Sequence, residues 1–218
     1  VLIERKELTS GSTWHAAGLL PLFNMSYSVG QIHKYSVKFY HELQEETGMN
    51  VGFRNVSNIR LAQTEDRMDE YRQYAGVAST IGVDVDFLTP GEVKDIWPLC
   101  NTEGLVGAIR HPADGYIQPA DLTQALARGA RDRGAEICRN TTVTGISYTS
   151  SGDWKITTDK GEITCEHVIS ATGNFARQTG RMVGLNIPVI PVEHQYIVTE
   201  PHDDIKARQA AGLPEMGV

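Results

Sequence analysis

The sequence predicts an α/β fold that combines part of a parallel sheet with an antiparallel part, and three observations support this prediction. The opening residues 1–4, Val-Leu-Ile-Glu, are typical of the end of a buried parallel strand. Apolar residues recur at helical spacing over 28–47. Three short segments of alternating polarity over 142–169, broken by turn signals at 151–153 and 159–161, indicate an antiparallel meander.

The first half of the chain predicts alternating helices and strands. After the opening strand, the segment 8–18 is rich in Ser, Thr, Gly and Ala, which suits backbone that lies close to a ligand. Gly48 is placed to end the helix over 28–47. The next elements that we expect, in order, are a strand pair at 51–53 and 57–62, a charged helix at 65–81 and a short strand at 85–88.

Two proline signals mark helix starts in the second half. Thr89-Pro90-Gly91-Glu92 has the form of a capping box with proline at the first helical position, which predicts a short helix to Trp97. Pro119 opens a second helix that ends at Gly134. The other elements that we expect are strand and turn over 104–116, a strand at 135–137, the meander with its last segment at 167–170, and a strand over 187–199 that Pro188 and Pro191 push toward a sheet edge.

Composition excludes several classes of function. A formal charge of -7 and a pI near 5.5, without a basic stripe, argue against a general nucleic-acid binder. Apolar runs are far shorter than the roughly 20 residues that cross a bilayer, so we expect a soluble protein with no membrane span. The three cysteines, Cys100, Cys138 and Cys165, are widely spaced, which predicts no disulfide framework, no metal site and a reducing compartment.

The two ends of the sequence predict a piece of a longer protein. The sequence begins with Val1 and not with an initiator Met, and residues 213–218 carry no signal that ends a helix or a strand. We therefore expect further chain on both sides.

Glu4 is the first candidate for a cofactor contact. In dinucleotide-binding folds an acidic side chain at the end of the second strand accepts hydrogen bonds from the adenosine ribose, and Glu4 follows its apolar run in that way. The Gly-rich G-x-G-x-x-G turn that precedes such a residue by about 20 positions would lie before Val1. A solvated strand end is the alternative for Glu4.

The segment Leu8–Gly18, Leu-Thr-Ser-Gly-Ser-Thr-Trp-His-Ala-Ala-Gly, resembles the sarcosine and dimethylglycine dehydrogenases of the D-amino-acid-oxidase-like superfamily. The resemblance implies FAD as cofactor and a covalent bond from His15 to a methyl group of the flavin's benzenoid ring. Neutral imidazole is a good nucleophile near neutral pH. Packing beside a noncovalent flavin is the alternative for His15. The resemblance also implies that small residues lie along the pyrophosphate and flavin: Ser10, Gly11, Ser12 and Thr13.

Two later segments resemble the same family. Residues 114–146 are similar to its return from the substrate-binding part to the FAD-binding part, which implies that the backbone at Val143 borders the adenine. Residues 169–174, Ile-Ser-Ala-Thr-Gly-Asn, resemble the turn that closes the FAD domain. By that resemblance Thr172 and Gly173 approach the cofactor.

Residues 191–201, Pro-Val-Glu-His-Gln-Tyr-Ile-Val-Thr-Glu-Pro, resemble a strand of the family's substrate domain. The resemblance implies that His194 lies near the flavin and orients the amine substrate or accepts its proton. A half-buried strand histidine that holds backbone is the alternative. Surface or capping positions are expected for the remaining histidines: His33, His41, His111, His167 and His202.

The resemblance implies an incomplete, Rossmann-like FAD-binding domain over 1–50 and 116–184, and an antiparallel-sheet substrate domain over 51–115 and 185–218. It implies oxidative N-demethylation of a small N-methylated amino acid, dimethylglycine or sarcosine: hydride passes to the flavin, and the iminium product hydrolyses to the demethylated amine and formaldehyde. The implied electron acceptor is a protein or oxygen. The implied compartment is the bacterial cytoplasm or the mitochondrial matrix.

Two alternatives stay open. The same scaffold suits an FAD-dependent oxidoreductase of another amine or of a polyol phosphate, and it also suits a noncatalytic flavoprotein-like subunit. The group that recognises a substrate carboxylate is also open, because arginine is the usual partner and three candidates exist: Arg54, Arg60 and Arg110.

Overall fold

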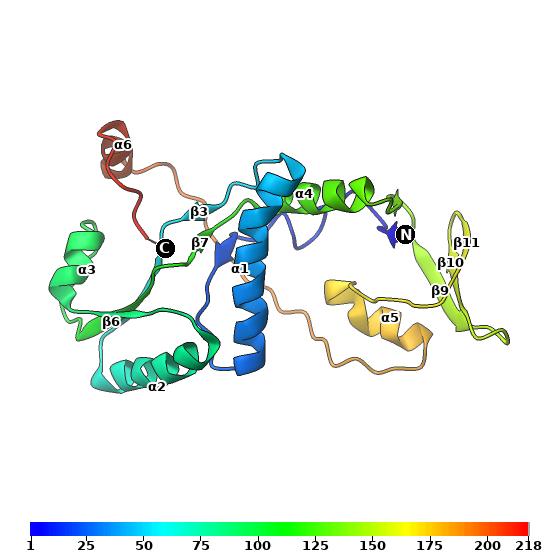
Figure 1. Cartoon of the computed structure of the whole chain (residues 1–218), viewed down its shortest axis with the longest axis horizontal. Coiled ribbons are helices and arrows are strands. Elements are labelled where there is room, and N and C mark those ends of the chain that lie inside the picture. Colours follow the sequence, from blue (N-terminus) through cyan, green and yellow to red (C-terminus); the bar gives the residue numbers. More distant parts are fainter. Residues whose placement is uncertain (218) are drawn as a thin grey trace. The chain divides into compact units, whose positions relative to one another are not determined.

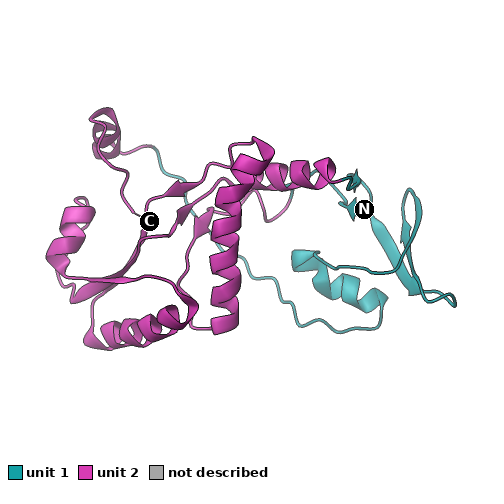
Figure 2. Cartoon of the chain, in the orientation of Figure 1, with its two compact units in different colours: residues 1–10, 134–200 teal, residues 11–133, 201–218 magenta. Residues whose placement is uncertain are grey.

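The computed structural model describes residues 1–217, which divide into two compact units (Figure 2). Unit 1 contains residues 1–10 and 134–200, and unit 2 contains residues 11–133 and the chain from Pro201 onward. Helices and strands are mixed in both, and several of the sheets are antiparallel, which confirms the predicted α/β class.

Unit 1 begins with a short parallel pair of strands. β1 (Leu2–Ile3) lies beside β8 (Ile137–Cys138), so the predicted parallel strand at the start of the chain is confirmed. The predicted meander is also present, in the order β11-β10-β9. The elements that complete unit 1 are β9 (Val143–Tyr148), β10 (Trp154–Thr158), β11 (Gly161–Cys165), the 3₁₀ turn η1 (Gly173–Phe175) and α5 (Ala176–Met182).

Two strand predictions in unit 1 are wrong. The third strand of the meander ends at Cys165 and does not include 167–170, where Ile169 is 90% exposed. Within the described chain, residues 187–199 form no strand, although their polarity alternates. Pro188 and Pro191 have no N–H to donate to a neighbouring strand, and apolar side chains of this segment face solvent.

The main sheet of unit 2 has one helix on each face. It has the antiparallel order β4-β6-β5, and Figure 1 shows α2 and α3 on opposite sides of β6. Because side chains alternate along a strand, Ile109 packs toward α2 while its neighbour Ala108 packs toward α3. The elements are β4 (Asn58–Ala62), α2 (Glu65–Ile81), β5 (Asp86–Leu88), α3 (Pro90–Ile96) and β6 (Gly107–His111).

The helix boundaries follow the predicted caps. Thr64 accepts a hydrogen bond from the Arg67 N–H at the start of α2, and Gly82 ends this helix with a left-handed backbone. Thr89 and Glu92 form the predicted capping box of α3.

A second, small sheet joins distant segments of unit 2 in the order β2-β7-β3. Its strands are β2 (Leu19–Leu20), β3 (Arg54–Asn55) and β7 (Gly115–Tyr116). Gly115 is required at its centre, because a Cβ there would lie 1.9 Å from the Arg54 carbonyl oxygen.

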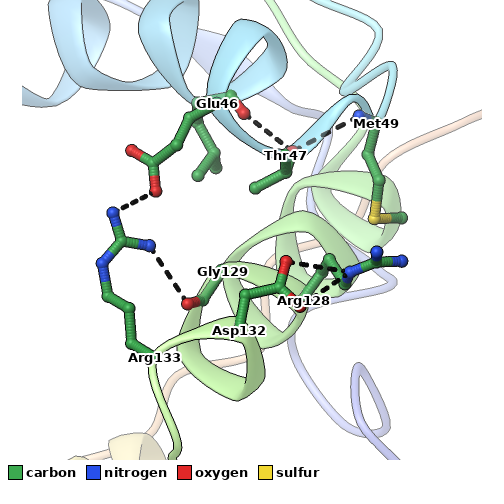
Figure 3. A network of polar contacts seen from close by, with 8 residues as sticks. Glu46, Thr47, Met49, Arg128, Gly129, Asp132 and Arg133 are labelled. Atoms are coloured by element: carbon green, nitrogen blue, oxygen red, sulfur yellow. Dashed lines mark hydrogen bonds and ion pairs between the residues drawn. The ribbon is translucent and has the colours of Figure 1, made fainter.

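Two helices, α1 (Tyr27–Thr47) and α4 (Pro119–Asp132), close over this small sheet, and α6 (Asp203–Ala210) follows near the end of the chain. The carboxyl end of α1 meets α4 where Gly129 leaves room for Thr47 (Figure 3). Beside that contact, Glu46 pairs with Arg133, whose guanidinium also donates to the Gly129 carbonyl at 3.1 Å.

Candidate functional site

The loop 11–18, which carries His15, lies at the surface of unit 2. Gly11 has φ +88°, and a side chain there would meet no atom within 4 Å, so the backbone conformation rather than crowding favours glycine. The side chains of Trp14 and His15 are both exposed, and their rings lie 3.8 Å apart between centroids. The loop therefore exposes two adjacent aromatic rings at the surface of unit 2.

One nitrogen of the His15 ring is committed within the loop. Nδ1 lies 2.8 Å from the Gly11 carbonyl oxygen, and because a carbonyl only accepts, Nδ1 carries the hydrogen in this bond. In a neutral imidazole the lone pair is then on Nε2. The bond to Gly11 thus fixes the orientation of the ring within the loop and, for a neutral imidazole, its tautomer.

The loop joins unit 2 through a tightly held stem. The Ile117 N–H donates to the Gly18 carbonyl at 2.9 Å, and a Cβ on Gly18 would lie 2.0 Å from the Ile117 oxygen. β2 then pairs with β7, and the N–H of Leu22 lies 3.0 and 3.1 Å from the two carboxyl oxygens of Asp114. The Leu22 carbonyl accepts from the Tyr74 hydroxyl at 3.1 Å.

Asp114 belongs to a buried group of ionisable side chains that the sequence did not reveal. Burial raises the pKa of Asp114 to about 7, although the Leu22 N–H and Arg60 act in the opposite direction. Burial, together with Arg60, lowers the pKa of His111 to about 4. Burial and the nearby Asp114 raise the pKa of Tyr74 to about 12. The one sequence signal for this group is an aspartate directly before the strand glycine Gly115.

The surface position expected for His111 is wrong. Its side chain is completely buried, and in the described part of the protein neither ring nitrogen has a hydrogen-bond partner. It packs against the rings of Phe23 and Tyr74. By contrast, the capping role expected for a histidine is confirmed at His202, which accepts from the Asp204 N–H at the start of α6.

Glu4 lies at the end of β1 in unit 1. One oxygen of its carboxylate accepts a hydrogen bond from the Lys6 N–H at 2.8 Å. The next residue, Arg5, places its guanidinium 3.9 Å from the ring centroid of Phe175, so the end of β1 lies beside the turn that contains Thr172 and Gly173. The structure thus brings three of the predicted cofactor contacts into one region of unit 1.

Small hydroxyl side chains surround that turn. The Thr172 hydroxyl lies 3.2 Å from the Ser170 hydroxyl and 3.1 Å from the Thr179 hydroxyl, and Gly173 has φ +52°. Thr172 and Gly173 are both exposed. Val143 is partly buried at the start of β9, which also packs against α5.

The other predicted site residues are divided between the units. Ser10 closes a turn in unit 1, where both its N–H and its hydroxyl donate to the Glu7 carbonyl. Ser12 and Thr13 belong to the exposed loop of unit 2, in which the Thr13 carbonyl accepts from the Ala16 N–H. His194 is exposed on the irregular segment of unit 1.

The three candidate arginines differ in their surroundings. Arg110 pairs with Asp86 at 3.7 Å, and the Arg60 guanidinium lies 4.4 Å from the ring centroid of Phe23. Arg54 is exposed on β3. Only Arg54 therefore presents its side chain mainly to solvent.

The predicted positions fit FAD in their chemistry. Glu4 offers a carboxylate to hydroxyl groups, residues 10–13 and 172–173 offer small side chains, and His15 offers a ring nitrogen. Among residues 1–217, no cluster of side chains suits a metal ion, and no helix is long and apolar enough to cross a bilayer.

Comparison with known sequences identifies close relatives of known activity. The chain is 39% identical to the mitochondrial dimethylglycine dehydrogenase of Rattus norvegicus over 95% of its length, and 35% identical to the human mitochondrial sarcosine dehydrogenase over 94%. It is 33% identical, over 93%, to the mitochondrial pyruvate dehydrogenase phosphatase regulatory subunit of Mus musculus. The chain spans 23–24% of the length of these three relatives.

Solved structures agree with the sequence relatives. Glycine oxidase from Geobacillus kaustophilus matches with a TM-score of 0.72 at 32% identity, over 84% of this chain and 51% of that one. L-proline dehydrogenase from P. horikoshii matches with a TM-score of 0.79 at 26% identity, over 84% and 48%. The family model of the FAD dependent oxidoreductases, DAO, matches residues 1–217. The chain therefore belongs to the DAO family of FAD-dependent oxidoreductases.

Proposed function

We propose that the full-length protein uses FAD to oxidise a small N-methylated amino acid, dimethylglycine or sarcosine, and releases the methyl group as formaldehyde. The observation that carries this proposal is the similarity, across nearly the whole chain, to enzymes named for these two substrates. When bound, FAD accepts the hydride that leaves the N-methyl carbon. A protein acceptor or oxygen then takes the electrons.

The His15 loop supports covalent attachment of the cofactor. With Nδ1 bonded to the Gly11 carbonyl, the Nε2 lone pair is the nucleophile. The ring is exposed, so the flavin can reach it. His15 would hold the flavin through a C–N bond to its methyl group, for which the methyl carbon and the imidazole would each give up a proton and the protein or oxygen acceptor would take the two electrons. We place the noncovalent contacts at Glu4, Ser10, Gly11, Ser12, Thr13, Val143, Thr172 and Gly173.

His194 is the proposed residue for handling the substrate amine. An amine must lose its proton before its carbon yields hydride, and imidazole accepts a proton near neutral pH. Its exposure in unit 1 leaves the ring available to a substrate. In this proposal residues 1–50 and 116–184 form the domain that binds FAD, and residues 51–115 and 185–218 form the domain that binds the substrate.

Acid denaturation of the full-length protein tests the attachment. We expect yellow colour to remain with the polypeptide in the wild type and in His41→Ala, a control at another exposed histidine of unit 2. We expect His15→Ala to release its flavin. Retention of flavin by His15→Ala after denaturation contradicts attachment at this residue.

Turnover measurements test the reaction. Sarcosine and dimethylglycine should bleach the flavin spectrum and yield formaldehyde, whereas glycine and glycerol phosphate should be poor substrates. His194→Gln should lower kcat and shift its pH profile while flavin content stays normal, and His167→Gln, at an exposed histidine of the same unit, should change neither. If His194→Gln and His167→Gln have equal kcat values, His194 has no role in the reaction.

A second candidate function is regulatory. The similarity to a phosphatase regulatory subunit favours it, because that relative matches over nearly the same length of this chain as the dehydrogenases do. A protein of this kind would bind its partner without amine turnover. Complete absence of bleaching by any N-methylated amine, in protein that contains FAD, would support this alternative. The compartment that we propose is the mitochondrial matrix for a eukaryotic source and the cytoplasm for a bacterial one.

A further inference from the structure

Leu22, seven positions after His15, has both of its backbone polar groups bound by buried side chains from other elements. Its N–H faces both carboxyl oxygens of Asp114 at 3.0 and 3.1 Å, and its carbonyl accepts from the Tyr74 hydroxyl at 3.1 Å. Leu22 is 5% exposed, Tyr74 1% and Asp114 0%. We call this arrangement the Leu22 clasp.

Leu22 lies outside every helix and strand. Buried backbone groups in such positions must find partners elsewhere, since each one left unpaired costs about 1–3 kcal/mol. Here the partners are a carboxylate directly before β7 and a hydroxyl on α2. The chain is therefore held at one residue from two directions.

The clasp continues into the stem of the His15 loop. The same segment that begins with Asp114 pairs with Leu19 and Leu20 through β7, and then donates the Ile117 N–H to the Gly18 carbonyl. Residues 18–22 are thus fixed along their length by residues 114–117. The loop itself is exposed, so its position depends on this stem.

We propose that Asp114 and Tyr74 are positioning residues that set the direction of the His15 ring for cofactor attachment. This inference rests on the proposed attachment at His15. Bond formation requires the nucleophile within about 3–3.5 Å of its target and correctly aligned, and a displacement of about 1 Å reduces rates strongly. Loss of either contact at Leu22 would let the stem shift, and the His15 ring would move with it.

Four variants of the full-length protein test this role. Asp114→Ala removes the acceptor of the Leu22 N–H, and Tyr74→Phe removes only the hydroxyl. Asp114→Asn keeps an oxygen acceptor and serves as the conservative variant. Val93→Ala is the control, because Val93 belongs to α3 and is fully buried on the other face of the main sheet, against Ile59 and Ala108.

The measured quantity is the fraction of bound flavin that stays with the polypeptide after acid denaturation. We expect Asp114→Ala and Tyr74→Phe to lower this fraction at least about fivefold, with noncovalent flavin still bound. Asp114→Asn should keep most of the attachment, and Val93→Ala should keep all of it despite a lower Tm. The inference is wrong if Tyr74→Phe and Asp114→Ala keep the wild-type fraction of attached flavin. It is also wrong if Val93→Ala, at a Tm equal to that of the clasp variants, loses as much attached flavin as they do.

Hydrogen exchange separates this inference from the proposed function. Amides of residues 16–20 and of Leu22 should exchange faster in Asp114→Ala and Tyr74→Phe than in Val93→Ala. If the wild type carries no attached flavin, the attachment at His15 is wrong, and the positioning role falls with it even where exchange shows the stem loosened. If the wild type is attached and exchange of the stem is unchanged in both clasp variants, only the positioning role is wrong.

Discussion

The two faces of the β4-β6-β5 sheet differ in what they bury. Toward α3 the contacts are apolar, with Ile59, Val93 and Ala108 at their centre. Toward α2 the apolar cluster surrounds ionisable groups, and these are Arg60, Tyr74, His111 and Asp114. One face therefore only stabilises the unit, whereas the other also fixes the loop that carries His15.

The polar face contains two groups with opposite linkage to pH. Asp114 keeps its proton to about pH 7 when folded but has an ordinary pKa of 3.8, so the folded state binds more protons between these values and stability falls as pH rises. His111 stays neutral down to about pH 4 when folded but titrates at 6.5 otherwise, so stability falls as pH drops. Between about pH 4 and 6.5 the two effects oppose each other.

Asp114→Asn should give the largest change in the comparison. Asparagine cannot ionise, so the variant avoids the burial of charge that the wild type carries above pH 7. We expect its free energy of unfolding to exceed that of the wild type at pH 8 by on the order of 4 kcal/mol, and to match it near pH 4. Urea denaturation across this range measures the difference. A constant difference at all pH values would show that Asp114 does not titrate near 7.

His111→Leu should give the opposite dependence at somewhat smaller size. Leucine has no ring nitrogens to leave unpaired and no proton to lose on folding. We expect the variant to gain stability over the wild type as pH falls from 7 to 4, by on the order of 3 kcal/mol. The same urea titration measures this gain. A variant that is less stable than the wild type at pH 4 would show that the imidazole makes a favourable contact.

Val93→Ala should be destabilising without any dependence on pH. It removes two methyl groups from a fully buried site on the apolar face, and we expect a loss of about 1–3 kcal/mol in the free energy of unfolding. Equal losses at pH 5 and pH 8 are expected. A loss that changes with pH would mean that this face is coupled to the ionisable groups.

Glu46→Gln should produce the smallest effect. Glu46 and Arg133 join α1 to α4 (Figure 3), but both side chains are more than a third exposed. Exposed ion pairs contribute about 0–1 kcal/mol and weaken in salt. We expect a loss below about 1 kcal/mol that disappears in 1 M NaCl, measured by urea denaturation at both salt concentrations.

Local signals in the sequence predicted helices α1 to α4 but not α6, and nonlocal contacts explain the buried residues that it missed. Thr64 and Gly82 mark the ends of α2 because a cap depends on residues within one turn. The burial of His111 depends on its pairing with Asn58 in β4, about fifty residues away, and on α2 above the sheet. Asp114 escaped notice for the same reason, since its partner Leu22 lies 92 positions earlier.

The candidate site shows the same limit. The residue types of the His15 loop are visible in the sequence, but the bond from His15 to Gly11, which determines the ring nitrogen that keeps its lone pair, depends on the fold of the loop. The segment that carries His194 alternates in polarity like a strand, yet no described strand pairs with it. Alternation alone does not supply the partner that a strand requires.

The parallel pairing of β1 with β8 affects the order in which the two units can fold during synthesis. β1 leaves the ribosome before its partner at residues 137–138, which follows about 130 residues later, a delay of roughly 7–27 s at ordinary elongation rates. All strands of both unit 2 sheets lie within residues 11–133 and emerge during that interval. Unit 2 is therefore expected to fold its sheets before β1 and β8 can pair, so the contact that joins the two ends of unit 1 forms only after the segment between them has emerged.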